Sequence, residues 1–154
     1  MQPGTDPREV VEALAGYEDA LGDLYAAFAV KFPRRADLWD LMSHEEHGHA
    51  DALRSLLGKA EDLAVFVDVE RFDVREVTVA TQRLREQTEV AQYSSLDLRE
   101  ALAQAVELER SMIESRALTV FQTDTPSVVA VLDHLREQSS QHRERLRAEL
   151  SAVR

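Results

Sequence analysis

One spacing of apolar and polar residues occurs twice in this chain, once in the first third and once near the end. In each copy an apolar residue is followed four positions later by a polar residue, then by a histidine three positions on, then by a leucine four positions on. The positions are Met42, Glu46, His49 and Leu53 in the first copy, and Leu135, Ser139, His142 and Leu146 in the second. This spacing places all four residues of a copy on one face of a helix.

A second pair of stretches is related in the same way. Glu18 is followed seven residues later by Tyr25, and Glu109 is followed seven residues later by Arg116. Leucines and alanines surround both glutamates at helical spacing, so Glu18 and Glu109 are expected to face a core. A carboxylate facing a core costs several kcal/mol unless it is paired or binds a metal. The chain therefore reads as two copies of one helical hairpin with polar residues buried at similar depth.

Capping residues, prolines and glycines along the chain predict four long helices and a shorter one. Asp6 and Pro7 start the first, which ends near Phe32 because the residue before a proline avoids helical geometry. The other helices are expected at 34–57 with Gly58 as the stop, at 73–92, from a cap at Ser94 or Ser95 to Gln122, and from Thr125-Pro126 to the C-terminus.

These helices predict an all-α fold: an antiparallel four-helix bundle with one long crossover that carries a short extra helix. Bundles with one long crossover include the ferritin-like folds. We expect a single domain over residues 1–154, built from hairpins at about 6–58 and 95–154 that are joined by the crossover 59–94.

Composition excludes several classes of function. The chain has no cysteine, which excludes disulfides, zinc–thiolate sites and Fe–S clusters. Its net charge of −11 disfavours nucleic acid as a partner. The N-terminus has no signal-peptide pattern and no apolar run is long enough for a membrane span, so a cytoplasmic location is expected. No phosphate loop or dinucleotide fingerprint is present, and neither nucleotide nor haem is expected.

The Glu-x-x-His spacing is itself informative, because it puts both side chains on one helical face, one turn apart, where they can hold one ion. One glutamate from each of two helices, combined with Glu-x-x-His motifs from the other two, is the arrangement of di-iron carboxylate proteins. Residues 18–29 (EDALGDLYAAFA) and 44–50 (HEEHGHA) resemble the first and second ligand helices of the rubrerythrin-like family within the ferritin-like superfamily. The resemblance covers nearly the whole chain.

The resemblance implies that five residues bind metal: Glu18, Glu46, His49, Glu109 and His142. Iron is the expected metal, as one or two ions, with manganese or zinc as alternatives. The implied function is iron oxidation or the handling of oxygen or peroxide, as a ferroxidase- or peroxidase-type oxidoreductase. Metal ions are the expected partners, and a homodimer is expected by analogy with related bundles.

Two positions depart from the family pattern. Ser139 stands where the family has a glutamate that bridges two irons, and Arg116 stands where an aromatic residue is expected. The cysteine-ligated module of full rubrerythrins is absent. The loss of a bridging carboxylate weakens binding of a second ion, and a single ion would be centred on Glu18, Glu46 and His49.

The alternative hypothesis is a bundle without metal, or with a single ion, that acts in protein–protein association. In it the glutamates form a salt-bridge network in which Arg116 pairs with Glu109 or Glu18, and Ser139 only fills space. In both hypotheses Tyr25 is a core aromatic with its hydroxyl bonded. The remaining polar residues near the motifs are expected on solvated faces: His44, Glu45, His47, Asp51, Glu107 and Glu114. Glu137 is five residues before His142, off the ligand face, and is not expected to replace the carboxylate missing at Ser139.

Overall fold

The computed structural model describes residues 6–59, 68, 72–111, 121 and 125–153. Its described elements are helical: α1 (Pro7–Lys31), a short 3-10 helix η1 (Pro33–Arg35), α2 (Ala36–Lys59), α3 (Val74–Val90), α4 (Leu98–Glu109) and α6 (Pro126–Ala152). The predicted all-α class is confirmed. None of the helices in these residues has the length and apolar character that crossing a membrane requires.

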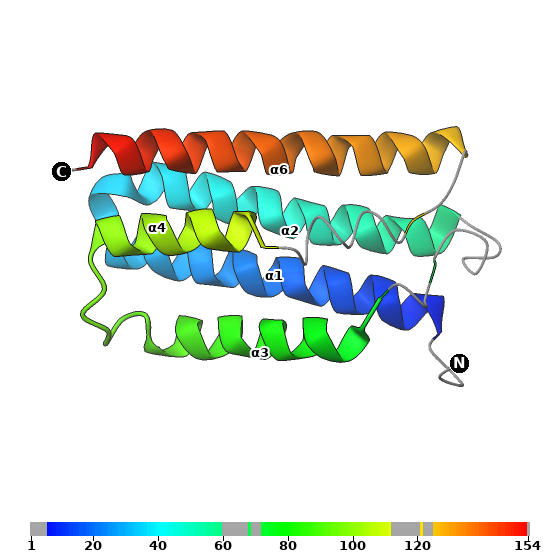
Figure 1. The fold of residues 1–154 in the computed structure, drawn as a ribbon, viewed down its shortest axis with the longest axis horizontal. Helices are drawn as coiled ribbons and strands as arrows, with labels where there is room; N and C mark the ends of the chain where they lie inside the picture. Colours follow the sequence, from blue (N-terminus) through cyan, green and yellow to red (C-terminus); the bar gives the residue numbers. More distant parts are fainter. Residues whose placement is uncertain (1–5, 60–67, 69–71, 112–120, 122–124, 154) are drawn as a thin grey trace.

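The helices lie roughly along one axis, side by side (Figure 1). Helices α1 and α2 form an antiparallel pair joined by η1, and their mutual packing is the most extensive in the fold. Helix α3 packs against α1, whereas α6 packs against both α2 and α4. Helix α1 therefore has neighbours on more than one side, and it buries residues around most of its circumference.

Most of the predicted helix boundaries are confirmed. Asp6 caps α1 by accepting a hydrogen bond from the Arg8 N–H at 2.9 Å, and Phe32 is the C-cap before Pro33. Asp73 caps α3, and α6 begins at Pro126. A side-chain cap satisfies backbone N–H groups that have no partner within the helix, which contributes about 1 kcal/mol to stability.

Two of the predicted helix boundaries, the end of one helix and the start of another, are wrong. Helix α2 continues through Gly58 to Lys59, so this glycine does not stop it. Helix α4 is capped by Asp97 rather than by Ser94 or Ser95, because Asp97 and Glu100 form a reciprocal capping box. Ser94 instead accepts a hydrogen bond from the Leu96 N–H within the turn that precedes the helix.

The prediction that this helix reaches Gln122 is also wrong, because α4 ends at Glu109. The Ser111 N–H bonds to the Leu108 carbonyl at 3.1 Å, a bond over three residues that tightens and closes the last turn. Residues 112–120, which include Arg116 and Glu114, lie outside the described residues. The expected pairing of Arg116 with Glu109 or Glu18 therefore stays a prediction.

An aromatic group in the core positions the polar residues described below. Trp39 of α2 is fully buried, with its ring centroid 5.6 Å from Tyr25 and 5.0 Å from Phe28, both on α1. Such contacts fix the rotamers of the rings and bind α1 to α2. Tyr25 is held so that its hydroxyl reaches across the core to α4.

Candidate metal centre

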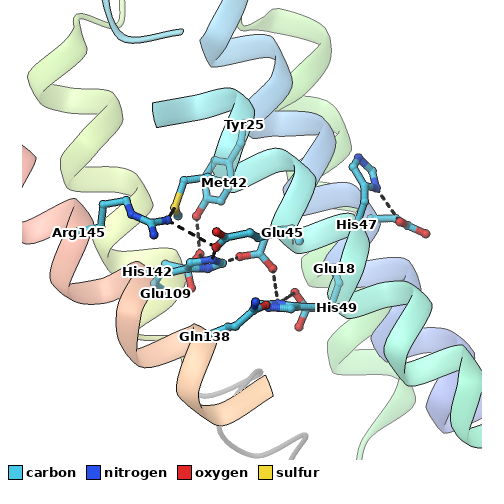
Figure 2. Close-up of polar contacts among 12 residues, drawn as sticks. Glu18, Tyr25, Met42, Glu45, His47, His49, Glu109, Gln138, His142 and Arg145 are labelled. Carbon is cyan, nitrogen blue, oxygen red and sulfur yellow. Dashed lines mark hydrogen bonds and ion pairs between the residues drawn. The ribbon is translucent and has the colours of Figure 1, made fainter. Parts of the chain in front are cut away.

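The five predicted ligand residues meet in the core, although they come from four helices. Glu18 lies on α1, Glu46 and His49 on α2, Glu109 on α4 and His142 on α6. None of the five is more than 6% exposed. Figure 2 shows the side chains of Glu18, His49, Glu109 and His142 gathered between the helices. The structure thus brings the whole predicted set together.

The five residues form two overlapping triads, which we name after their histidines. The His49 triad is Glu18, Glu46 and His49, and the His142 triad is Glu46, Glu109 and His142. Within each triad, one ligand atom from each residue lies within 4.8 Å of the others. Glu46 belongs to both, so one carboxylate lies between two potential ion positions.

Both histidines present the same ring nitrogen to the carboxylates. His49 Nδ1 lies 3.1 Å from Glu46 Oε2 and 3.9 Å from Glu18 Oε2. His142 Nδ1 lies 2.9 Å from Glu46 Oε1 and 3.7 Å from Glu109 Oε1. Glu46 therefore directs one oxygen to each imidazole. The two rings are stacked with their centroids 5.3 Å apart.

The outer nitrogen of each imidazole is held by the opposite helix. His49 Nε2 on α2 donates to Gln138 Oε1 on α6 at 2.6 Å, and His142 Nε2 on α6 donates to Glu45 Oε2 on α2. An amide oxygen and a carboxylate only accept, so each Nε2 carries a hydrogen. Nδ1, which faces Glu46, is therefore the nitrogen that can bind a metal once it has lost any hydrogen of its own.

Glu45 and Gln138 are the two site residues that the sequence analysis missed. The prediction that Glu45 is exposed is wrong: its side chain is only 17% exposed and lies 3.5 Å from Arg145 Nη1. Glu45 is covered because α6 packs over this part of α2. A signal was present in the sequence, since Glu45 directly precedes Glu46 just as Gln138 directly precedes Ser139 in the second copy of the motif.

Burial and mutual charge perturb the titration of the cluster. Burial, followed by the charge of Glu46, raises the pKa of Glu18 well above its usual value. Burial alone would lower the pKa of His142, but hydrogen bonds to Glu109 and Glu46 outweigh it and raise this pKa to about 11. Burial opposes ionisation of Glu109 as well, yet its bonds, first to His142, lower its pKa. Without a metal, protons supply the positive charge that the carboxylates need.

Tyr25 supports the His142 triad from the side of α1. Its hydroxyl donates to Glu109 Oε1 at 2.8 Å, within the core. Burial and the charges of Glu109 and Glu46 raise the pKa of Tyr25 well above its usual value, so it remains a donor. The prediction of a core aromatic with a bonded hydroxyl is confirmed, and its partner is one of the candidate ligands.

The residues present fit a divalent cation. Glu18 Oε2 and Glu109 Oε2 are buried and accept no hydrogen bond from any described residue. Buried carboxylate oxygens are normally paired, so these two atoms are available as ligands. Carboxylates and imidazoles together suit iron, manganese and zinc. Ser139 is buried at the repeat position of Glu46, one turn before His142.

A second cluster of charged residues lies on another face of α1 and α2. His47 Nδ1 donates to Asp19 Oδ1 at 2.7 Å, and Arg54 Nη1 donates to Asp19 Oδ2 at 2.8 Å. His47 was predicted on a solvated face, and its side chain is 40% exposed. It also packs over Gly22, where an added Cβ would lie 2.8 Å from its Nε2. His44, Asp51 and Glu107 are exposed, as predicted, and Glu137 is exposed as well.

Comparison of the chain with protein-family models, with curated proteins and with solved structures finds no match. The buried cluster of glutamates and histidines is therefore the feature of this chain that points to a function.

Proposed function

We propose that this chain is a rubrerythrin-like metal-binding protein of the ferritin-like superfamily, and that its buried cluster holds one or two iron ions. The observation that carries the proposal is the pair of triads that share Glu46, each with its ligand atoms within 4.8 Å of one another. Three carboxylates and two imidazoles form a donor set that iron accepts, with manganese and zinc as alternatives.

The helical arrangement supports this proposal. Two hairpin-like pairs, α1 with α2 and α4 with α6, each contribute ligands, and α3 lies in the connection between them (Figure 1). We propose that they form an antiparallel four-helix bundle whose long crossover carries α3. In such bundles, metal sites are built from side chains on facing helices.

The protein's own residues would bind and orient the ions. Glu46 lies between the two positions, the histidines offer Nδ1, and Tyr25 holds Glu109 through its hydroxyl. When bound, iron supplies one-electron chemistry with oxygen or peroxide, which is the reaction class we propose. Ser139 provides no carboxylate beside His142, so the ion position at the His142 triad has fewer charged ligands than the family pattern provides.

One observation favours a second candidate, a metal-free bundle that acts in protein association. Burial disfavours the charged form of His142, but its bonds to Glu109 and Glu46 prevail and give it a pKa of about 11. Its Nε2 also bonds to Glu45, which lies near Arg145. A protonated His142 would complete a network of ion pairs without metal, with Arg145 in the role that the sequence analysis assigned to Arg116.

An anaerobic Fe(II) titration of the metal-stripped protein, with elemental analysis, separates the candidates. We expect one or two irons per chain in the wild type and at least a hundredfold weaker binding in Glu46→Gln, because this carboxylate serves both triads. The matched control is Glu107→Gln, an exposed position on α4 that should bind iron normally. Absence of binding by the wild type to Fe(II), Mn(II) and Zn(II) would overturn the proposal in favour of the metal-free bundle.

The expected homodimer, the cytoplasmic location and the absence of nucleic-acid and membrane partners stay predictions. Each is independent of the buried cluster, and none is needed for the metal titration.

A further inference from the structure

The two triads have the same ligand types but differ in what lies behind the histidine. Each triad has two glutamates and one imidazole that offers Nδ1. Behind His142, the acceptor of the Nε2–H is the carboxylate of Glu45. Behind His49, the acceptor is the amide oxygen of Gln138, at 2.6 Å. The two acceptors occupy equivalent positions in the repeated motif, so this is a difference of charge at a matched place.

A carboxylate behind a ligating histidine strengthens the metal bond more than an amide does. The negative charge attracts the Nε2 hydrogen, which leaves more electron density on Nδ1, and it also fixes the orientation of the ring. Loss of such an outer partner typically reduces metal affinity by about 10- to 100-fold. The amide of Gln138 fixes the ring of His49 equally well but adds no charge.

Two further contacts favour the His142 triad. Arg145 Nη1 lies 3.5 Å from Glu45 Oε2 and 3.7 Å from Met42 Sδ, so it holds the Glu45 carboxylate beside the imidazole. Tyr25 donates to Glu109 Oε1, which fixes a ligand that only the His142 triad contains. Glu18 and Glu109 each retain one buried oxygen that accepts no hydrogen bond from the described residues, so the two triads are alike in that respect.

We propose that Glu45 is a positioning residue that ranks the two triads, so that the first ion binds at Glu46, Glu109 and His142 and the second binds more weakly at Glu18 and His49. The inference rests on the proposed metal binding and assigns an order within it. It differs from the expectation, based on sequence, that a single ion is centred on Glu18, Glu46 and His49. The missing carboxylate at Ser139 is compensated on this side by a carboxylate outside the ligand set.

The order can be read directly from the imidazole nitrogens. The metal-stripped full chain, labelled with 15N in its histidines, is titrated with Zn(II), which is diamagnetic, while long-range 1H–15N spectra are recorded. His49→Gln and His142→Gln variants assign the two signals. Below one equivalent of Zn(II), we expect the Nδ1 signal of His142 to shift first and the signal of His49 to shift only as the second equivalent is added.

A pair of matched variants tests the cause. Glu45→Gln should raise the dissociation constant of the first Zn(II) ion by about 10- to 100-fold, because an amide oxygen would then accept from both His142 and His49. Gln138→Glu should instead strengthen binding at the His49 triad and bring the two signals closer in the titration. Should Glu45→Gln fail to fold, the order of shifts in the wild type still decides the ranking.

The outcomes are distinct. If His49 shifts first or both signals shift together, the ranking is wrong. If Glu45→Gln binds the first ion as tightly as the wild type, the role proposed for Glu45 is wrong. In each case the proposed metal binding stands. If neither histidine responds to Zn(II), and Fe(II) and Mn(II) also fail to bind, the proposed function is wrong and the ranking falls with it.

Discussion

Helices α1 and α2 carry two clusters of carboxylates and histidines that are built from neighbouring residues. Glu18 and Glu46 are buried in the core, whereas the next residues along the chain, Asp19 and His47, pair with each other. Figure 2 shows His47 pointing away from Glu109 and His142. The residue types are nearly the same in both clusters, but the side chains of the first are buried and those of the second are partly exposed to solvent.

Glu18 and Asp19, neighbours in the sequence, have pKa shifts of opposite sign. Burial raises the pKa of Glu18, and the charge of Glu46 raises it further. Burial also acts to raise the pKa of Asp19, but hydrogen bonds from His47 and Arg54 outweigh it and lower that pKa. In the core, carboxylates need a proton or a metal to offset their charge, while on the surface a side-chain cation and water suffice.

The largest expected effect comes from replacing one histidine in each cluster by glutamine and comparing the two losses of stability. His142→Gln in the metal-free protein should lower the free energy of unfolding by about 3–5 kcal/mol, because it leaves buried carboxylates without their cation. His47→Gln removes a half-exposed partner of Asp19 and should cost less than about 1 kcal/mol. Urea unfolding of both variants measures the difference, and equal losses would show that burial does not separate the clusters.

The deficit of His142→Gln should also depend on pH. The folded pKa of about 11, reached because bonds to Glu109 and Glu46 outweigh burial, lies above the unfolded value. The stability from this proton is therefore fully present below about pH 6.5 and is lost as pH rises toward the folded pKa. Unfolding at pH 6 and at pH 9 should show a smaller deficit at pH 9.

Metal binding gives a further test of the buried cluster, through the proton on His142. A cation at His142 Nδ1 must displace the proton that this ring holds in the metal-free protein, so binding releases that proton. Between pH 6 and pH 7.5, Zn(II) affinity should rise by about tenfold per pH unit, which corresponds to about 1.4 kcal/mol. Calorimetry in two buffers of different ionisation enthalpy counts the protons. A binding constant that does not change with pH would exclude His142 as a ligand.

The smallest effect is expected on the outer face. Arg54→Met removes hydrogen bonds to Asp19 and Glu12 and should lower the free energy of unfolding by about 0.2–1 kcal/mol at pH 7. The lowered pKa of Asp19 contributes stability above its unfolded value of about 3.9, and this contribution is lost as pH falls through the folded pKa. The difference from wild type should therefore shrink between pH 7 and pH 3.5.

The control is Arg136→Met, which removes an exposed pair with Asp133 within α6. Because this pair lies within one helix and connects no two helices, the loss of stability should be no larger than that of Arg54→Met. A loss from Arg54→Met as large as that from His142→Gln would mean that the outer cluster, and not the core, holds α1 and α2 together.

Local signals in the sequence predicted much of the fold. Proline and aspartate at positions 6, 7, 73 and 126 identify helix starts, because caps act within one turn. Local signals failed where several residues of the same kind compete, as Ser94, Ser95 and Asp97 do for one cap, and where the chain leaves a helix without proline, as it does after Glu109. The choice there depends on which bonds the neighbouring turn and helices leave open.

The sequence by itself determined which residues enter the cluster. Helical period and an internal repeat place Glu18, Glu46, His49, Glu109 and His142 on apolar stripes, and the structure buries all five. Tertiary structure alone decided the partners outside the ligand set. Glu45 lies at the edge of its stripe, where helical period does not distinguish a solvated residue from a covered one, and its burial depends on how α6 packs against α2. The residue pattern of each helix therefore determines which residues form the ligand set. The contact between α2 and α6 determines that a carboxylate lies behind His142 and an amide behind His49.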